Sequence, residues 1–315
     1  MLTAVEGFKV GHYTDLKALT GCSVILCPPK TRCSCEVRGS SPGSRELALL
    51  SPDKKNEEIH AILLTGGSAF GLAAADGVVK WLEEREIGYQ TPWAKVPLVP
   101  SAVIFDLNVG EKSVRPDAAA GFAACKNASS HAPEEGNVGA GTGATVGKWK
   151  GIEYCMKGGI GTLSTTIGDL VVGVLVVVNA VGDVVDDAGK IIAGARSSEG
   201  AFFANQDNVR SFARGKVLEK ANTTLAVAAT NAELSKIELF RLSQRMHDGF
   251  ARAIQPVHTS FDGDISFALS WGSVRSDFDF IAEITTSLTA DAIRNAVRSA
   301  RTVNNIPGML PSSRE

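Results

Sequence analysis

The sequence predicts a mixed α/β fold, because strand-like and helix-like patterns alternate along it. A strand, a glycine-containing turn and a helix are expected over residues 61–86, and two apolar strands joined by a tight turn over residues 163–178. A third unit, a strand followed by a long amphipathic helix, is expected over residues 225–254. With 315 residues, the chain can form one large domain or two closely packed ones.

The composition excludes several classes of partner. Of the residues, 44% are hydrophobic and 21% are charged, as in an ordinary globular protein, and the formal net charge is -2. Nucleic acids and anionic membrane surfaces are bound through an excess of positive charge, so we expect neither as a partner. The N-terminus has no signal-peptide pattern and the longest apolar run, 170–180, is too short to cross a bilayer. A cytoplasmic location is therefore expected.

The cysteines indicate neither a metal site nor a disulfide framework. Cys33 and Cys35 are separated by a single residue, which is closer than in the usual zinc-binding pair, and no second pair completes a site. We expect the six cysteines to be small buried thiols in a reducing compartment, and we expect no metal and no cofactor.

The N-terminal part is expected to form short strands. Residues 23–27 have the pattern of a buried strand that ends at Pro28-Pro29, and residues 33–37 are its expected partner. A polar loop leads from there into a short helix at residues 46–50.

Ser68 stands between the strand 61–64 and the helix 69–86, at a place that invites comparison with a nucleophilic serine. In an α/β-hydrolase the nucleophile lies within Gly-x-Ser-x-Gly, and here Phe70 stands where the second glycine is required. Ser68 is therefore interpreted as the N-cap of the helix or as part of a pocket wall lined by backbone.

The glycine-rich segment 136–148 resembles a phosphate-binding loop but does not meet its requirements. A strand is expected over residues 102–107 and a small-residue helix over residues 117–126. An acidic loop separates that helix from the glycine-rich segment. No strand precedes it directly, no helix follows, and Trp149 stands where a Walker motif requires Ser or Thr. We interpret the segment as a loop whose backbone can approach a ligand closely, ending at Lys148.

Asn179 follows the wholly apolar strand 171–178. A polar amide at that place is either a turn-forming residue or a functional group. Beyond it, residues 183–195 are expected to form a polar loop or hairpin, and residues 197–214 a loop accessible to cleavage.

Thr223 stands at the start of the next strand, directly after Asn222. As a β-branched residue it suits an ordinary strand position. Alternatively, the Asn222–Thr223 bond is cut, and Thr223 becomes an N-terminal residue that carries both a hydroxyl nucleophile and a general base, its α-amine, with an unperturbed pKa near ~8. The segment by itself leaves both interpretations open.

Asp262 and Asp264 flank Gly263 just before a strand expected over residues 265–269. The two carboxylates fit a plain turn, a cation site or a catalytic acid pair, but a calcium loop requires a longer acidic series and a terminal Glu. A helix over residues 289–302 is expected to close the chain.

Taken together, several segments resemble the DmpA-type N-terminal-nucleophile (Ntn) hydrolases of peptidase family S58. This family includes L-aminopeptidase/D-esterases, β-peptidyl aminopeptidases and nylon-oligomer hydrolases. The matching segments occur in the family's order and are residues 64–72, 137–148, 172–179, 222–224 and 262–264. The resemblance implies a four-layer α/β/β/α sandwich, as in DmpA-type and ornithine acetyltransferase-like proteins. It also implies that residues 1–315 form a single domain, that self-cleavage separates residues 1–222 from residues 223–315, and that the processed units assemble as a homotetramer or similar oligomer.

The resemblance further implies catalytic roles. Thr223 corresponds to the nucleophile and Asn179 to the amide that stabilises the oxyanion, while Lys148, Asp262 and Asp264 match the branch that includes the nylon-oligomer hydrolases. An acid pair can hold the Thr223 ammonium or a substrate ammonium, and a lysine placed near the amine lowers its pKa.

Gly67, Ser68 and Phe105 are the expected substrate-binding residues. The aminopeptidase branch carries Tyr where this chain has Phe105, Ser as its nucleophile, and Ser-Gly-Glu in place of residues 262–264. These differences separate the chain from the β-peptide and D-amino-acid specificities of that branch.

We therefore expect a self-cleaving hydrolase that cleaves small peptides, aminoacyl amides or amide oligomers through an acyl-enzyme on Thr223. Two other functions stay open. An acyl transferase similar to ornithine acetyltransferase has the same general fold and a threonine nucleophile, but transfers the acyl group to an amine instead of water. A binding protein on the same scaffold performs no turnover.

Overall fold

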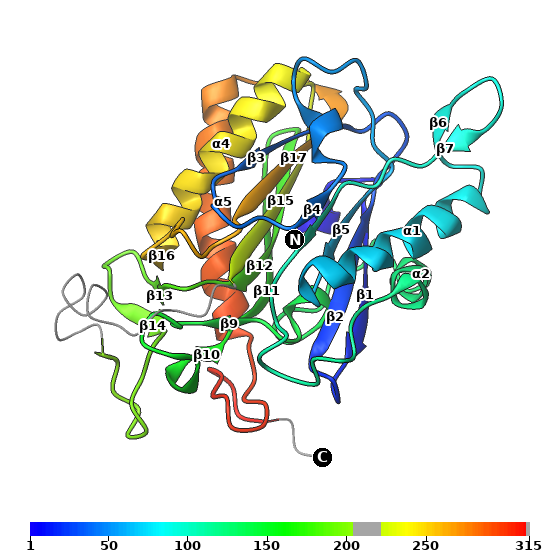
Figure 1. Cartoon of the computed structure of the whole chain (residues 1–315). Coiled ribbons are helices and arrows are strands. Elements are labelled where there is room, and N and C mark those ends of the chain that lie inside the picture. The colour runs from blue at the N-terminus through cyan, green and yellow to red at the C-terminus, as the bar shows by residue number, and fades with distance from the viewer. Residues whose placement is uncertain (204–221, 313–315) are drawn as a thin grey trace.

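Two five-stranded β-sheets pack face to face, and a pair of helices covers the outer face of each (Figure 1). The computed structural model describes residues 1–203 and 222–312, so most of the cleavable loop expected over 197–214 lies outside the described residues. Within the described part, the layer order is the four-layer α/β/β/α sandwich expected from the resemblance.

The first sheet is built mostly from the N-terminal third of the chain and is covered by α1 and α2. Its strands occur in the order β1-β2-β5-β8-β4, and only the β5–β8 pair is parallel. A parallel pair needs a crossover connection, which α1 supplies. The bounds are β1 Lys9–Asp15, β2 Thr20–Leu26, β5 Ala61–Thr65, β8 Ser101–Val103, β4 Ser44–Arg45, α1 Ala74–Glu83 and α2 Ala118–Lys126.

The second sheet contains the longest strands and is covered by α4 and α5. Its order is β11-β12-β15-β17-β3, with a parallel β15–β17 pair whose crossover is α4. The bounds are β11 Gly159–Ile167, β12 Leu170–Asn179, β15 Thr223–Ala232, β17 Ile265–Val274, β3 Arg32–Val37, α4 Lys236–Ala253 and α5 Phe278–Arg298.

Short elements complete the described chain. Residues 183–195, expected as a polar loop or hairpin, form the hairpin of β13 and β14, and β13 also pairs with β16. The remaining short elements are β6 Tyr89–Gln90, β7 Lys95–Val96, β9 Thr145–Val146, β10 Met156–Lys157, β13 Asp183–Val185, β14 Ile191–Ala193, β16 Ile254–Gln255, and the 3₁₀ helices η1 Leu2–Ala4, η2 Leu47–Leu50, η3 Ser68–Ala73, η4 Gly139–Gly141 and η5 Ile152–Tyr154.

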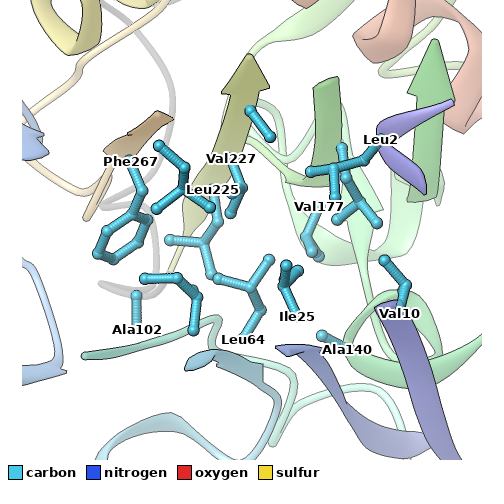
Figure 2. Packing of buried hydrophobic residues seen from close by; sticks show 14 of the residues in the cluster. Leu2, Val10, Ile25, Leu64, Ala102, Ala140, Val177, Leu225, Val227 and Phe267 are labelled. Carbon is cyan, nitrogen blue, oxygen red and sulfur yellow. The ribbon is translucent and has the colours of Figure 1, made fainter. Parts of the chain in front are cut away.

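The central core lies between the two sheets. Figure 2 shows Leu64 of the first sheet against Leu225, Val227 and Phe267 of the second, and all four side chains are fully buried. Alternate residues of β15, such as Ala226, face α4 and α5 on the other side. A strand buried on both faces is a continuous apolar run, which is why this strand was recognisable in the sequence.

The structure corrects one strand pairing. Residues 33–37 do form a strand, but β3 pairs with β17 of the second sheet, and β2 pairs with β1 and β5 instead. The chain crosses between the sheets after Leu26, at the Pro28-Pro29 break. The prediction that residues 33–37 pair with residues 23–27 was wrong, because two strands that are close in the sequence can belong to different sheets.

The structure also corrects two helix starts. Ser68 is not an N-cap: it has a left-handed φ of 53° and begins a 3₁₀ turn without a side-chain cap, and the α-helix starts only at Ala74. The last helix starts at Phe278, eleven residues before the expected start at Thr289, with the Asp277 carboxylate accepting from the Phe280 N–H. Its first turns contain Phe278, Phe280, Thr285 and Thr286, whose low helix propensity concealed the start of the helix.

Three further findings concern membrane-spanning helices, the cysteines and metal sites. None of the described helices is long and apolar enough to cross a membrane. All six cysteines are free, and burial raises the pKa of Cys35 and Cys125 to about 12, so these thiols stay protonated at neutral pH. Within residues 1–203 and 222–312, no group of three or more His, Cys, Asp or Glu side chains is placed to hold a metal ion.

The α1–α2 contact predicts an effect on stability. A β-carbon at Gly121 would lie 1.9 Å from the Ala74 carbonyl oxygen, so the two helix backbones require glycine there. We expect Gly121→Ala to lower the free energy of unfolding by about 1–3 kcal/mol, as overpacking typically does. Chemical denaturation measures this effect, with Ala119→Ser on the exposed face of the same helix as control. Equal stability of the two variants would contradict the close-packing argument.

Candidate active site

The strand register of the second sheet brings three of the predicted site segments together. Antiparallel pairing of β12 with β15 places Asn179 opposite Thr223, although they are far apart in the sequence. On the other side of β15, Asn222 forms a parallel bridge with Asp262 at the entry to β17. The start of β15 is therefore flanked by the end of β12 and by the acidic turn.

Thr223 is buried at this junction, and its hydroxyl lies against the preceding peptide group. Thr223 Oγ1 donates to the Asn222 carbonyl oxygen at 2.5 Å, and the same oxygen accepts the Gly263 N–H at 2.8 Å. A β-carbon at Gly263 would lie 2.7 Å from Thr223 Oγ1, so only glycine permits this approach without displacement. The Asn222 carbonyl is thus polarised by an amide and has the Thr223 hydroxyl at its side.

The two carboxylates of the acidic turn are buried, and every carboxylate oxygen has a partner. Asp264 Oδ1 accepts the Thr224 N–H at 2.7 Å, and Oδ2 lies 2.7 Å from His258 Nδ1. Asp262 Oδ1 accepts the Val181 N–H at 3.3 Å, and its Oδ2 accepts the amide and the hydroxyl of Thr259 at 2.9 and 2.6 Å. Burial and the charge of Asp264 raise the pKa of Asp262 to about 6.

Lys148 and Asn179 form a second buried group. Lys148 Nζ donates to the Asn179 side-chain oxygen at 2.8 Å and to its carbonyl oxygen at 3.2 Å. The Asn179 amide group in turn donates to the Phe105 carbonyl oxygen at 3.1 Å, and the Thr145 N–H fixes its oxygen end at 3.1 Å. Lys148 therefore orients the Asn179 amide, and burial lowers the pKa of Lys148 to about 7.

The expected substrate-binding residues are only partly brought together. Phe105 lines a surface pocket of about 530 Å³, whose other lining residues are Leu107, Asn108, Lys112, Ser113 and Arg115. Gly67 lies beside it, because a β-carbon at this position would lie 3.1 Å from Arg115 Cβ. The Gly67 N–H donates to Asp106 at 2.7 Å. Ser68 follows on the same turn but does not line the pocket.

Four polar residues of this region, three of them buried and His258 partly buried, were missed in the sequence. His258 contacts Asp264, the His247 ring packs edge-on against His258, and Asp106 accepts from Gly67 and from the Thr20 hydroxyl at 2.8 Å. Lys157 is wholly buried and donates to the Thr142 carbonyl oxygen at 2.8 Å, and burial lowers its pKa to about 8. Of the four, only His258 carried a sequence signal, since it lies four residues before Asp262 in the same polar loop.

Comparison with known proteins places the chain among amide hydrolases. The model of peptidase family S58 matches residues 1–309. An uncharacterized aminopeptidase of Mycobacterium leprae is 39% identical over 345 aligned residues, covering 99% of this chain and 94% of that protein. A 6-aminohexanoate-oligomer endohydrolase of Agromyces is 35% identical over 272 residues, covering 84% of this chain and 73% of that protein.

Solved structures confirm the fold. The L-aminopeptidase D-Ala-esterase/amidase of Ochrobactrum anthropi, described as a variant of the Ntn-hydrolase fold, is similar with a TM-score of 0.75. The match covers 97% of this chain and 88% of that chain at 20% identity, so it informs on architecture alone.

The raised pKa of Asp262 predicts a pH-dependent stability. Because its pKa is about 6 in the folded chain against an ordinary 3.8, the folded state retains a proton that the unfolded state has lost between these values. Stability is therefore lost as pH rises from about 4 to 6, and Asp262→Asn escapes that loss.

The test uses a Thr223→Ala background, so that the comparison does not depend on the Thr223 hydroxyl. We expect the melting temperature of the Asn variant, relative to its Asp parent, to increase between pH 4 and pH 7. A difference that is constant across this range would show that Asp262 titrates normally.

Proposed function

The chain belongs to peptidase family S58, and we propose that it is a self-cleaving amide hydrolase with Thr223 as its nucleophile. The observation that carries the proposal is the Asn222 carbonyl, held between the Thr223 hydroxyl at 2.5 Å and the Gly263 N–H at 2.8 Å. An ordinary strand residue has no need of this arrangement, whereas an attack by a hydroxyl on the preceding carbonyl requires it.

Self-cleavage proceeds as an acyl shift followed by hydrolysis. Thr223 Oγ1 forms a bond to the Asn222 carbonyl carbon, and the Gly263 N–H stabilises the negative oxygen that develops. The C–N bond then breaks, the hydroxyl proton ends on the Thr223 nitrogen, and an ester joins the two residues. Water cleaves this ester, leaving a carboxylate on Asn222 and a free hydroxyl and α-amine on Thr223.

Turnover uses the groups that cleavage liberates. The new α-amine takes the proton of its own hydroxyl, as general base, while Oγ1 attacks the substrate carbonyl. Asn179 lies opposite Thr223, and its amide is oriented by Lys148, so its N–H stabilises the oxyanion. Loss of one such donor typically costs ~3 kcal/mol of barrier. Water finally releases the acyl group.

Charges around the site indicate the substrate class. Asp262 and Asp264 supply negative charge on the β17 side, suited to an ammonium group. The pocket on the Phe105 side contains Lys112 and Arg115, and neither forms an ion pair with a described residue. We therefore propose small amides that carry a carboxylate beyond the scissile bond, as short peptides and amide oligomers do.

Arg115 is the better fixed of the two pocket cations. Its guanidinium lies over the ring of Phe70 at 4.2 Å from the centroid, which holds the side chain without neutralising it. The relatives named above are hydrolases, which favours water over ornithine as the acyl acceptor; an assay of acyl transfer to ornithine tests the transferase alternative directly.

Thr223 variants separate cleavage from turnover. We expect Thr223→Ala to stay as one uncut chain without activity, because neither the hydroxyl nor the new amine is available. Thr223→Ser is expected to cut, since the acyl shift needs only a hydroxyl. Intact mass and denaturing gels measure cleavage, and amide hydrolysis measures turnover.

Thr224→Val is the matched control for the Thr223 variants. The Thr224 hydroxyl is buried and has no partner among the described residues, and Val keeps its shape. We expect this variant to cut and hydrolyse amides like the wild type. If Thr224→Val stayed uncut while Thr223→Ala matured, the nucleophile would have to be reassigned.

Arg115 variants test the substrate class. With a 6-aminohexanoate oligomer as substrate, we expect Arg115→Ala to lower kcat/KM about tenfold, the loss of roughly one charged contact. The same oligomer with its carboxylate blocked as an amide should be cleaved equally by both enzymes. Lys55→Ala, an exposed lysine outside the pocket, is the control. Equal losses on both substrates would argue against carboxylate recognition.

A further inference from the structure

His258 is a partly buried polar residue that the proposed chemistry has not used. Its Nδ1 lies 2.7 Å from Asp264 Oδ2, with 18% of the His258 side chain and 2% of the Asp264 side chain exposed. The other oxygen of Asp264 accepts the Thr224 N–H, the first amide after the nucleophile. One carboxylate thus connects His258 to the backbone that carries Thr223.

Among residues 1–203 and 222–312, the ring of His258 has no further polar contact. The ring packs edge-on against His247, with 4.8 Å between centroids, and lies 5.8 Å from the Phe250 ring. His247 Nε2 lies 3.3 Å from the Glu36 carbonyl oxygen, which can only accept, so Nε2 carries the proton. Burial lowers the pKa of His247 to about 3, which keeps it neutral. His258 therefore packs against an uncharged wall.

A histidine at this position costs more folding free energy than an apolar residue that only packs. His258 Nε2 and His247 Nδ1 are both buried without a hydrogen-bond partner among the described residues. Burying an unpaired polar nitrogen costs free energy that an apolar side chain of similar size avoids. His258 also has a left-handed φ of 52°, an uncommon conformation for a residue with a side chain. Its polar contact is with Asp264, so that contact is the functional candidate.

Asp264 needs a hydrogen-bond donor because the carboxylate of Asp262 is a close neighbour in the same acidic turn. Two buried carboxylates repel each other, and the pKa of Asp262 is raised first by burial and then by the charge of Asp264. A donor on Asp264 Oδ2 fixes the rotamer of that carboxylate. In that rotamer, Oδ1 stays on the Thr224 N–H, and the start of β15 keeps its place beside Asn179.

We propose that His258 is a positioning residue, which holds the Asp264 carboxylate on the Thr224 N–H and so aligns Thr223 for both self-cleavage and turnover. The inference rests on the proposed function. It assigns His258 no contact with substrate, and it predicts that the donor at Nδ1, not the imidazole as such, is what the site requires.

The test compares His258→Asn with His258→Leu, two side chains of nearly equal size. The Asn side-chain NH₂ can take the place of Nδ1–H, whereas Leu has no donor. We expect His258→Leu to slow self-cleavage and to lower kcat about tenfold or more, with KM changed about threefold or less. We expect His258→Asn to recover most of both rates. Time-resolved gels, steady-state kinetics and melting temperatures are the measurements.

His247→Gln is the matched control. It alters the neighbouring buried histidine, keeps a donor for the Glu36 carbonyl oxygen, and does not touch Asp264. We expect wild-type kcat from it, even if its melting temperature falls. Wild-type rates in His258→Leu, or equal losses in the Asn and Leu variants, would overturn the inference. A wild-type chain that neither cuts nor hydrolyses amides would instead refute the proposed function, so the two failures are distinguishable.

Discussion

The pairing of β15 with its two neighbours is the constraint on which the site depends. Antiparallel register with β12 sets Asn179 opposite Thr223, and the parallel partner β17 follows directly on the acidic turn. Because side chains alternate along a strand, a slip by one residue would turn Thr223 toward the opposite face and put Thr224 in its place. The register is held by the apolar residues of β15, which bury one set of side chains between the sheets and the other set under α4 and α5.

Burial, more than any single contact, sets the electrostatics around this junction. It is the largest cause of the lowered pKa values of Lys148, about 7, and Lys157, about 8, and of the raised pKa of Asp262, about 6. In water these groups would be fully charged at neutral pH. In the folded chain their pKa values lie close to neutrality, where a proton can leave or join at small cost. Such values are typical of groups that exchange protons during a reaction.

The sequence predicted the parts of the molecule whose signal is local. The strands ending at Asn179 and starting at Thr223 were visible as apolar runs. Both polar residues stood out because they lie at the ends of those runs. Contacts between distant segments were not visible: β3 joins the second sheet, and Lys157 is buried although a lone lysine in a glycine-rich stretch usually marks a surface. His258 was missed for the same reason, since its meaning depends on where its loop folds.

In the proposed mechanism, the contacts that hold the Asn222–Thr223 bond before cleavage also keep Thr223 in place afterwards. Before cleavage, Asn222 is held by the Phe261 carbonyl and the Gly263 N–H, and Thr223 by the strand that follows. Hydrolysis removes the covalent link between the two residues but leaves the pairing of β15 with β12 and β17 and the Thr224–Asp264 hydrogen bond. A new N-terminus ordinarily frays. Thr223 is the first residue of a central strand, so the proposed cleavage would leave its amine and hydroxyl beside Asn179, in the geometry of the uncut chain.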